Sequence, residues 1–439
     1  MTWKLESRNN IRTMSTNFYR ELRARVERET GKGSREFEKQ YSASISHLKK
    51  KGSKPDRIAR QLARFELSVP SWAFSAGGTR FFRFEFPGEP QNIFEKVEDA
   101  AVVNLLTGMA PRVSLHYPWD KVADPKALAR YARRLGLKFD AINSNTFQDH
   151  PGQKLSYKFG SLCNADARVR KQAIDLNIET IEFGKSTGCK AIVVWLGDGS
   201  NHPGQMHFRK SYDRYIESLG KIYQRMPRDW KLCLEYKPFE PAFYYTVNFD
   251  WGCSCAAATE VGSRTQVLVD LGHHLPGANI EAIVARLIQL GKLGGFHFND
   301  SKYGDDDLTA GSINNYRLFL IMNEIADGEA EIGASLGLSY MIDQSHNVKD
   351  PVEEMIQTCE ELAAAYCRAL LVDRKALAEA QEKCDPIGAE RVLKEAFEAP
   401  IQGLLSRVRM DKGGVADPIA FYRKIKYRDQ LIRRRKKEG

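Results

Sequence analysis

Four short apolar runs decide the fold of this chain: KLCLEY (231–236), TQVLVDL (265–271), GGFHFND (294–300) and LSYMID (338–343). Each run combines apolar residues with β-branched or aromatic side chains, which is typical of a buried strand. Each also carries an acid or a histidine at or near its carboxyl end. Successive strands of a parallel barrel bring their carboxyl ends to one face, where such barrels keep their active sites. These runs therefore predict consecutive barrel strands with functional residues at the mouth.

Four earlier runs bring the number of predicted strands to eight. They are SWAF (71–74), RVSLHY (112–117), KFDAINS (138–144) and KAIVVWLG (190–197). Helical patterns lie between the strands, and the clearest places Ile280, Val284 and Leu287 on one face. Asn279 is its predicted N-cap and Gly291 lies just beyond its end. This alternation predicts an α/β fold, a (β/α)8 TIM barrel, with a doubly wound sheet as the structural alternative.

The same pattern predicts three parts of the chain. Residues 1–65 form a charged helical N-terminal extension, and residues 66–372 form the (β/α)8 catalytic barrel. Residues 373–439 form a helical C-terminal extension with a basic tail. Asp350 and Pro351 predict the start of the helix after the eighth strand, as its cap and its first-turn proline.

Composition and charge exclude several classes of protein. The 439 residues are 42% hydrophobic, which is ample for a sizeable core. No run approaches the ~18 consecutive apolar residues of a membrane span, and the first residues have no apolar signal-peptide core. The net charge of +10 lies at the ends, because residues 1–60 carry +9 and residues 423–439 carry +7, leaving −6 between them. We expect solvated helix faces or interface arms there, not a nucleic-acid arm.

Cysteine usage indicates the compartment. None of the eight cysteines forms a C-x-x-C pair. Free thiols beside strand-like runs behave as small hydrophobic residues, which is typical of a reducing environment. A cytoplasmic location is therefore predicted.

The first ligand group consists of Glu235, Asp270, His297 and Asp343, which fall on four consecutive predicted strands. Their strand ends converge in a barrel, so they can share one cation. Carboxylates with a histidine suit an oxygen-rich divalent ion better than a tetrahedral structural zinc. A single acid after a strand is most often a helix cap, and a histidine between phenylalanines is most often a hydrogen-bonded core residue. The prediction of a metal site therefore rests on the whole group.

The second ligand group consists of His273, Asp305 and Asp307, with Asp270 shared. His273 lies three residues beyond Asp270, and the two other acids alternate in the loop YGDDDL (303–308). Alternate residues of an extended loop can face the same way, so this pair can grip one ion. Asp270 is placed to bridge both ions with its two oxygens.

Neighbouring polar residues receive different interpretations. Lys237 projects from the same strand face as Glu235, where a cation can neutralise charge on a substrate oxygen. Asn299, Asp300 and Asp306 are interpreted as caps or loop residues. Two histidines remain ambiguous: His274 and His346.

Linked motifs identify a family. They include EYKPFEPAFY, VDLGHH, ARLIQLGKLGGFHFNDSKYGDDDL and MIDQSHNVKDP within residues 231–351, and SWAFSAGGTRF, SLHYPWD, INSNTFQDHPGQ and VVWLGDGSNHPGQ before them. With these motifs, about residues 60–430 resemble the L-rhamnose isomerase family of the broad-specificity bacterial type, one of the xylose-isomerase-like barrels. The resemblance implies aldose–ketose isomerisation, a homotetramer and two divalent ions, typically Mn²⁺, with Mg²⁺ or Co²⁺ also possible.

The resemblance also implies contacts with the substrate. By motif position, Lys237 and His116 contact substrate oxygens, and Trp72, Phe147 and Trp195 line the pocket. An aromatic residue of a neighbouring subunit completes the pocket in that family. The matching position here is Phe81, with Phe82 and Phe84 as rivals.

The expected reaction converts L-rhamnose to L-rhamnulose by moving one hydrogen from C2 to C1 and one proton from O2 to O1. Lys237, Asp305 and Asp343 are the expected catalytic residues, the two acids acting beside a water that shuttles the proton. Either a hydride shift or an enediol fits the residues, and the resemblance favours the hydride shift.

Alternative functions stay open. L-lyxose, L-mannose or D-allose could be the main substrate. A nucleic-acid enzyme built on a related metal barrel would use the basic ends, but its mouth should be basic and rich in histidine. A sugar-binding barrel without catalysis would not need two ion sites and a lysine. We therefore expect a small-molecule substrate, with no nucleic-acid or membrane partner.

Overall fold

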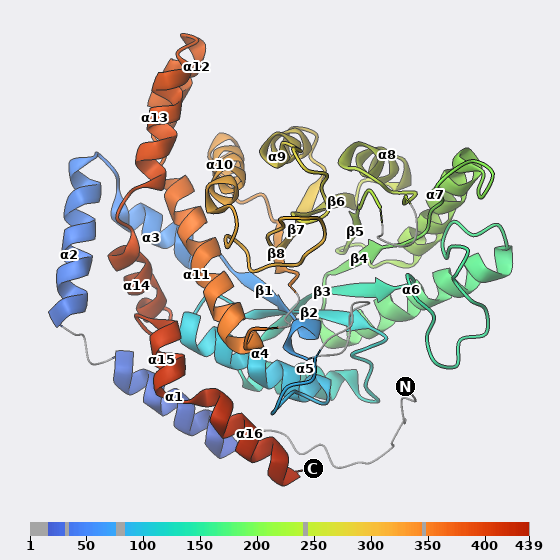
Figure 1. The fold of residues 1–439 in the computed structure, drawn as a ribbon, viewed down its shortest axis with the longest axis horizontal. Helices are drawn as coiled ribbons and strands as arrows, with labels where there is room; N and C mark the ends of the chain where they lie inside the picture. The colour runs from blue at the N-terminus through green and yellow to red at the C-terminus, as the bar shows by residue number, and fades with distance from the viewer. Residues whose placement is uncertain (1–15, 31–34, 76–83, 240–244, 345–347, 439) are drawn as a thin grey trace.

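The centre of the molecule is a ring of eight parallel strands in sequential order (Figure 1). The computed structural model describes residues 16–30, 35–75, 84–239, 245–344 and 348–438. The strands are β1 (Leu67–Pro70), β2 (Arg112–Tyr117), β3 (Lys138–Asn145), β4 (Ala191–Trp195), β5 (Lys231–Glu235), β6 (Thr265–Asp270), β7 (Leu293–Phe298) and β8 (Ser339–Ile342). The ring closes where Leu67 pairs with Tyr340 and Ser68 with Met341. The predicted (β/α)8 barrel is confirmed.

The prediction of the first strand is wrong. SWAF (71–74) forms a short 3₁₀ helix, η1 (Ser71–Phe74), and β1 lies directly before it. Pro70 ends the strand because its ring removes the N–H group that a longer ladder would need. The consequence is that Trp72 lies in a helical turn at the carboxyl end of β1. The other seven strands lie within about two residues of their predicted positions.

A helix follows each strand on the outside of the barrel. These helices are α4 (Ile93–Thr107), α5 (Pro125–Arg134), α6 (Ala167–Thr187), α7 (Phe208–Arg225), α8 (Trp251–Val261), α9 (Ile280–Gln289), α10 (Asn315–Ile332) and α11 (Pro351–Leu370). The predicted caps are confirmed: Asn279 accepts a hydrogen bond from the N–H of Ala282, and Gly291 has a positive φ of 62°. Asp350 caps α11, which begins at Pro351.

Small and medium-sized side chains fill the inside of the barrel. The buried cluster there consists of Ala141, Ala191, Val193, Cys233, Leu268 and Met341. A much larger apolar core lies between the strands and the surrounding helices. The barrel centre is therefore a packed core and not a pore. Polar side chains gather instead at the carboxyl ends of the strands, as in other barrels of this type.

Helices lie at both ends of the chain, outside the eight strand–helix units, and the predicted helical extensions are confirmed. They are α1 (Thr16–Thr30), α2 (Arg35–Lys50), α3 (Pro55–Ala63), α12 (Arg374–Glu382), α13 (Pro386–Phe397), α14 (Gln402–Asp411), α15 (Pro418–Lys424) and α16 (Tyr427–Glu438). The ring of Phe18 on α1 lies 6.2 Å from that of Tyr427 on α16, while α12 and α13 project from the body (Figure 1). The domain boundaries near residues 66 and 372 stay predictions. Among the described helices, none combines the length and the apolar character needed to cross a membrane.

Candidate metal and substrate site

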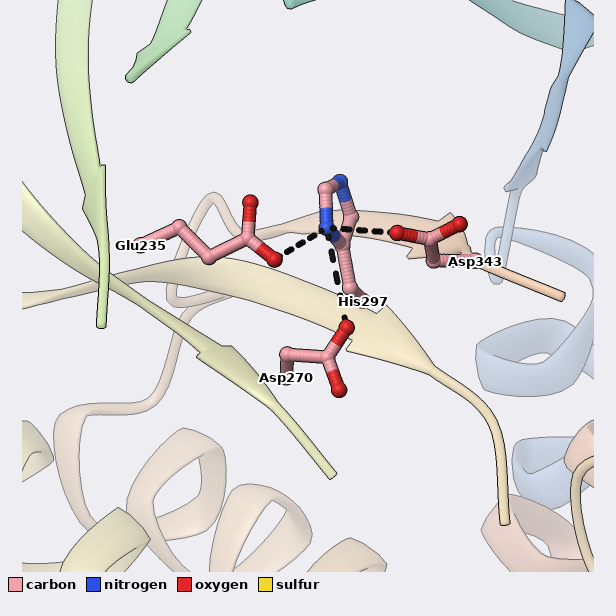
Figure 2. A group of neighbouring side chains, drawn as sticks. All are labelled: Glu235, Asp270, His297 and Asp343. Atoms are coloured by element: carbon pink, nitrogen blue, oxygen red, sulfur yellow. Dashed lines mark hydrogen bonds and ion pairs between the residues drawn. The ribbon is translucent and has the colours of Figure 1, made fainter. Parts of the chain in front are cut away.

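The first ligand group meets at the mouth of the barrel (Figure 2). Glu235 and Asp270 end their strands, His297 is the next-to-last residue of β7, and Asp343 directly follows β8. His297 Nδ1 lies 3.1 Å from a Glu235 oxygen, 3.6 Å from an Asp343 oxygen and 3.9 Å from an Asp270 oxygen. One ligand atom from each residue lies within 4.8 Å of the other three. Strand register therefore brings four residues that are distant in sequence to one point.

The two oxygens of Asp270 have different surroundings. Oδ1 accepts hydrogen bonds from the N–H of Gly272 at 2.8 Å and from the side-chain amide of Asn299 at 3.0 Å. Oδ2 is buried, has no hydrogen-bond partner among the described residues, and lies 3.9 Å from His297 and 4.0 Å from His273. Oδ2 thus faces both ligand groups, and the bridging of two ions by both oxygens stays a prediction. Asn299, interpreted from sequence as a loop residue, orients this carboxylate.

The second ligand group is brought together in part. His273 Nε2 lies 3.1 Å from one oxygen of Asp305, and the ammonium of Lys237 lies 2.5 Å from the other. His273 Nδ1 is 3.1 Å from the Tyr236 carbonyl, which can only accept, so Nδ1 carries the proton and Nε2 faces the site. Asp307 lines the same cavity, with a backbone φ of 49°.

Asp306 holds the acidic loop in shape. Its carboxylate accepts hydrogen bonds from the N–H groups of Lys302, Tyr303 and Gly304 at distances between 2.7 and 3.3 Å. Because the middle acid of the three is used in this way, the acids on either side are available to the cavity. Its sequence interpretation as a loop residue agrees with this geometry.

The acids and histidines shift one another's pKa. Burial lowers the pKa of His297, but the carboxylates around it, that of Glu235 foremost, raise it to about 9. Burial also opposes the charged form of His273, yet Asp270 and Asp305 raise its pKa to about 9. Burial is the main cause that raises the pKa of Asp270 to about 7. Ligands must lose their protons to bind a cation, so protons and metal ions compete for this site.

The donor set fits a divalent cation. Three carboxylates and one imidazole face a common point, and one buried carboxylate oxygen there has no hydrogen bond from the described residues. A buried carboxylate oxygen without a hydrogen bond is costly, and a cation at that point would offset the cost. Oxygen-rich sets with one or two imidazoles are typical of Mn²⁺ and Mg²⁺ sites.

Aromatic rings form the opposite wall of the cavity. Phe147 and Trp195 lie 4.5 Å apart, and the ring of Trp72 lies 5.4 Å from His116 in an edge-on arrangement. The indole N–H of Trp72 donates to Asp343 Oδ1 at 2.8 Å. The wall is therefore linked directly to the first ligand group.

Three cavity-lining residues were missed from sequence: Trp119, Asn143 and Ser144. The ring of Trp119 stacks on His116 with the ring centres 3.9 Å apart. The motif SLHYPWD placed it three residues beyond His116, which was the available signal. Asn143 pairs with His116 across β2 and β3, so strand register was the signal for it.

Some predicted residues cannot be placed or have other roles. Phe81, Phe82 and His346 lie outside the described residues, and Phe84 is 71% exposed. His274 accepts from the Tyr236 hydroxyl at 2.6 Å through Nε2, and its Nδ1 is 3.3 Å from a backbone carbonyl. His274 is thus a half-buried, hydrogen-bonded residue.

A known family matches more than half of this chain. Residues 94–335 match the family described as xylose isomerase-like TIM barrel. The chain belongs to that family. Its barrel, with acids and histidines at the carboxyl ends of β5 to β8, agrees with this membership.

Relatives span nearly the whole chain. A probable sugar isomerase of Mesorhizobium japonicum is 50% identical over 93% of this chain and 95% of its own length. One from Rhizobium meliloti is 50% identical over 90% of this chain and 92% of its own length. A xylose isomerase of Thermus thermophilus is 27% identical over 43% of this chain and 49% of its own length. The chain is therefore an isomerase.

Proposed function

We propose that this isomerase converts L-rhamnose to L-rhamnulose with two divalent metal ions. The observation that carries the proposal is the convergence of the first ligand group within 4.8 Å, beside an aromatic wall. The probable sugar isomerases of similar length support a sugar substrate. The motif resemblance supports L-rhamnose, and L-lyxose, L-mannose and D-allose are the alternative aldoses.

The ion sites follow the two ligand groups. Glu235, Asp270, His297 and Asp343 would hold one ion. His273, Asp305 and Asp307 would hold the other, with Asp270 shared, and Mn²⁺ is the ion we infer, ahead of Mg²⁺ and Co²⁺. When bound, such ions would chelate O1 to O3 of the open-chain sugar and stabilise negative charge on these oxygens, an effect of several kcal/mol.

The side chains would orient the sugar and move its proton. Lys237 is held between Asp305 and the ring of Trp195, 5.5 Å from the ring centre, and would donate a hydrogen bond to a sugar oxygen. Asp305 or Asp343 would hold the water that carries the proton from O2 to O1. The hydrogen-bonded Oδ1 of Asp343 is already fixed by Trp72.

The hydrogen on C2 would move to C1 as a hydride. This route keeps that hydrogen out of contact with solvent, whereas an enediol route exchanges it. The reaction run in deuterium oxide separates the two. Deuterium at C1 of the ketose would contradict the hydride shift.

The aromatic wall would exclude water and contact the apolar part of the sugar. Trp72, Phe147 and Trp195 present rings to the cavity, and a 6-deoxysugar has a methyl group that suits such a surface. His116 would contact a sugar oxygen from the same side. Phe81 of a neighbouring copy would complete the pocket in a homotetramer, whose mass light scattering after gel filtration would measure.

One experiment tests the function. The protein is stripped with EDTA, dialysed, and incubated with each of the four aldoses, and ketose is measured by chromatography. We expect no ketose in the stripped protein, recovery with Mn²⁺, and the highest kcat/KM for L-rhamnose. Ketose formation that is unaffected by chelation would contradict the proposal, and a preference for another aldose would correct the substrate.

A nucleic-acid enzyme is less well supported. Arg434 and Arg435 in the basic tail are engaged by Glu98 and Asp99 of α4 at 2.7 and 3.1 Å. These arginines are therefore committed within the chain and do not form a free basic surface. DNA binding that weakens steeply with salt would favour this alternative.

A further inference from the structure

One buried carboxylate joins two walls of the substrate cavity. Asp120, which is 2% exposed, lies just after β2. Its Oδ2 accepts hydrogen bonds from the hydroxyl of Ser71 and from the N–H of His116, the latter at 2.8 Å. Ser71 begins η1 and directly precedes Trp72. A single oxygen thus holds the end of β2 and the turn after β1 at a fixed separation.

A buried lysine balances this carboxylate. Lys96 Nζ on α4 lies 3.2 Å from Asp120 Oδ1, and the two side chains are only 11% and 2% exposed. Removing two charges from water costs free energy that their attraction only partly returns, so apolar side chains of similar volume would often be as stable. Stability alone therefore does not account for an ion pair at this position.

The groups held by this pair are cavity groups. Trp72 donates to Asp343 and lies edge-on to His116. The ring of His116 stacks on that of Trp119. Its Nδ1 has no hydrogen-bond partner among the described residues, so stacking is the contact that holds this side of the ring. Asp120 therefore holds the residue before Trp72 through the Ser71 hydroxyl, and the backbone of His116 itself.

We propose that Lys96 and Asp120 are positioning residues, a buried ion pair that fixes Trp72 and His116 on two walls of the substrate cavity. The kinetic consequence rests on the proposed function, and the geometric consequence does not. We call the hydrogen bonds that Asp120 accepts from Ser71 and His116 the tie. Loss of the tie would move the rings of Trp72 and His116. The sugar would then bind less tightly, while the residues of both ligand groups would keep their positions.

The matched control is Asp99, a second buried acid with a buried cationic partner. It lies on α4, as Lys96 does, and pairs with Arg435 on the outer wall at 3.1 Å. Asp120→Asn and Asp99→Asn are the same chemical change. We expect both to lower the unfolding midpoint, but only Asp120→Asn should raise KM for the aldose, by about tenfold or more, with a smaller fall in kcat. Lys96→Met should act like Asp120→Asn, and Lys96→Arg should restore KM to within about threefold.

A second readout needs no turnover. In protein labelled with 5-fluorotryptophan, the ¹⁹F resonance of Trp72 is assigned by its loss in Trp72→Phe. We expect Asp120→Asn to shift or broaden this resonance and Asp99→Asn to leave it in place. If Asp120→Asn does not fold, Lys96→Met combined with Asp120→Leu removes both charges and both hydrogen bonds and is measured instead.

The two readouts separate this inference from the proposed function. Wild-type protein that converts no aldose contradicts the proposed function, while a moved Trp72 resonance still supports the tie. An unmoved resonance overturns the inference whatever the kinetics show. A KM within twofold of wild type in Asp120→Asn overturns it as well.

Discussion

Two buried clusters of charge differ in their balance. At the barrel mouth, five acids face one lysine and three histidines; the acids are Glu235, Asp270, Asp305, Asp307 and Asp343. Where α4 meets α16, the acids have arginine partners: Asp99 and Glu95 pair with Arg435 at 3.1 and 3.3 Å, and Glu98 pairs with Arg434. Both clusters are removed from water. In this paired cluster every acid has an arginine partner, although three acids share two arginines, and the pairs join helices. The larger excess of acids at the mouth indicates a place for added cations.

The largest expected effect concerns the unbalanced cluster. Asp270→Asn should lower kcat/KM for the aldose at least about a thousandfold, because it changes the carboxylate shared by both ligand groups. Burial raises the pKa of Asp270 to about 7, so above that pH the charged form costs folding free energy. The EDTA-treated variant should thus unfold at the same or a higher temperature than wild type at pH 8.

The control for this change is Asp175→Asn on α6, an exposed acid that pairs with exposed Lys171. It should alter neither activity nor melting temperature. A clear fall in the melting temperature of Asp270→Asn in EDTA would show that the acid excess at the mouth stabilises the fold. That result would contradict the difference drawn between the two clusters.

The paired cluster should lose stability and keep its activity when one of its acids is replaced. Asp99→Asn leaves the buried guanidinium of Arg435 with less compensation, since Asp99 is fully buried and its partner side chain is 6% exposed. Breaking such a pair should cost about 3 kcal/mol of unfolding free energy, measured by urea titration. At 25 °C the folded variant should keep the wild-type kcat/KM. A change in kcat/KM above threefold would mean that α16 contributes to the site.

The smallest expected effect concerns His274, which is neutral at pH 7 in the folded protein. Burial lowers the pKa of His274 to about 4. The unfolded chain, with a histidine pKa near 6.5, then binds more protons, so stability should fall as the pH falls from about 6.5 toward 4. Between pH 7 and pH 5 the loss should be about 2 kcal/mol.

His274→Asn isolates this contribution. Its unfolding free energy, measured in urea with EDTA, should change less than that of wild type between the two pH values, whatever the substitution costs at pH 7. Equal changes in both proteins would show that other groups govern the acid response.

Strand positions could be predicted because a buried strand has a local signature. Seven runs of β-branched and aromatic residues lay within about two residues of their strands. SWAF was predicted as a strand from its aromatic residues but forms η1, because Pro70 ends the strand before it. The meeting of the first ligand group followed from the same signature. A residue at a strand end is placed by the register of the strand.

Contacts between distant segments could not be predicted. The tie from Asp120 to Ser71 spans 49 positions and has no periodicity that a single sequence displays. Asn299 was interpreted as a loop residue because its bond to Asp270 depends on how β6 and β7 pair. The partners of the basic tail could not be predicted from the sequence either. Arg434 and Arg435 pair with acids of α4, more than three hundred residues earlier in the chain.

The closure of the ring between β1 and β8 has a consequence for synthesis of the protein. During translation, β1 leaves the ribosome long before its second neighbour exists, so its outer edge stays unpaired until β8 emerges. All four residues of the first ligand group lie on β5 to β8 or directly after β8. The first ligand group is therefore incomplete until Asp343 has emerged, late in the synthesis of the chain.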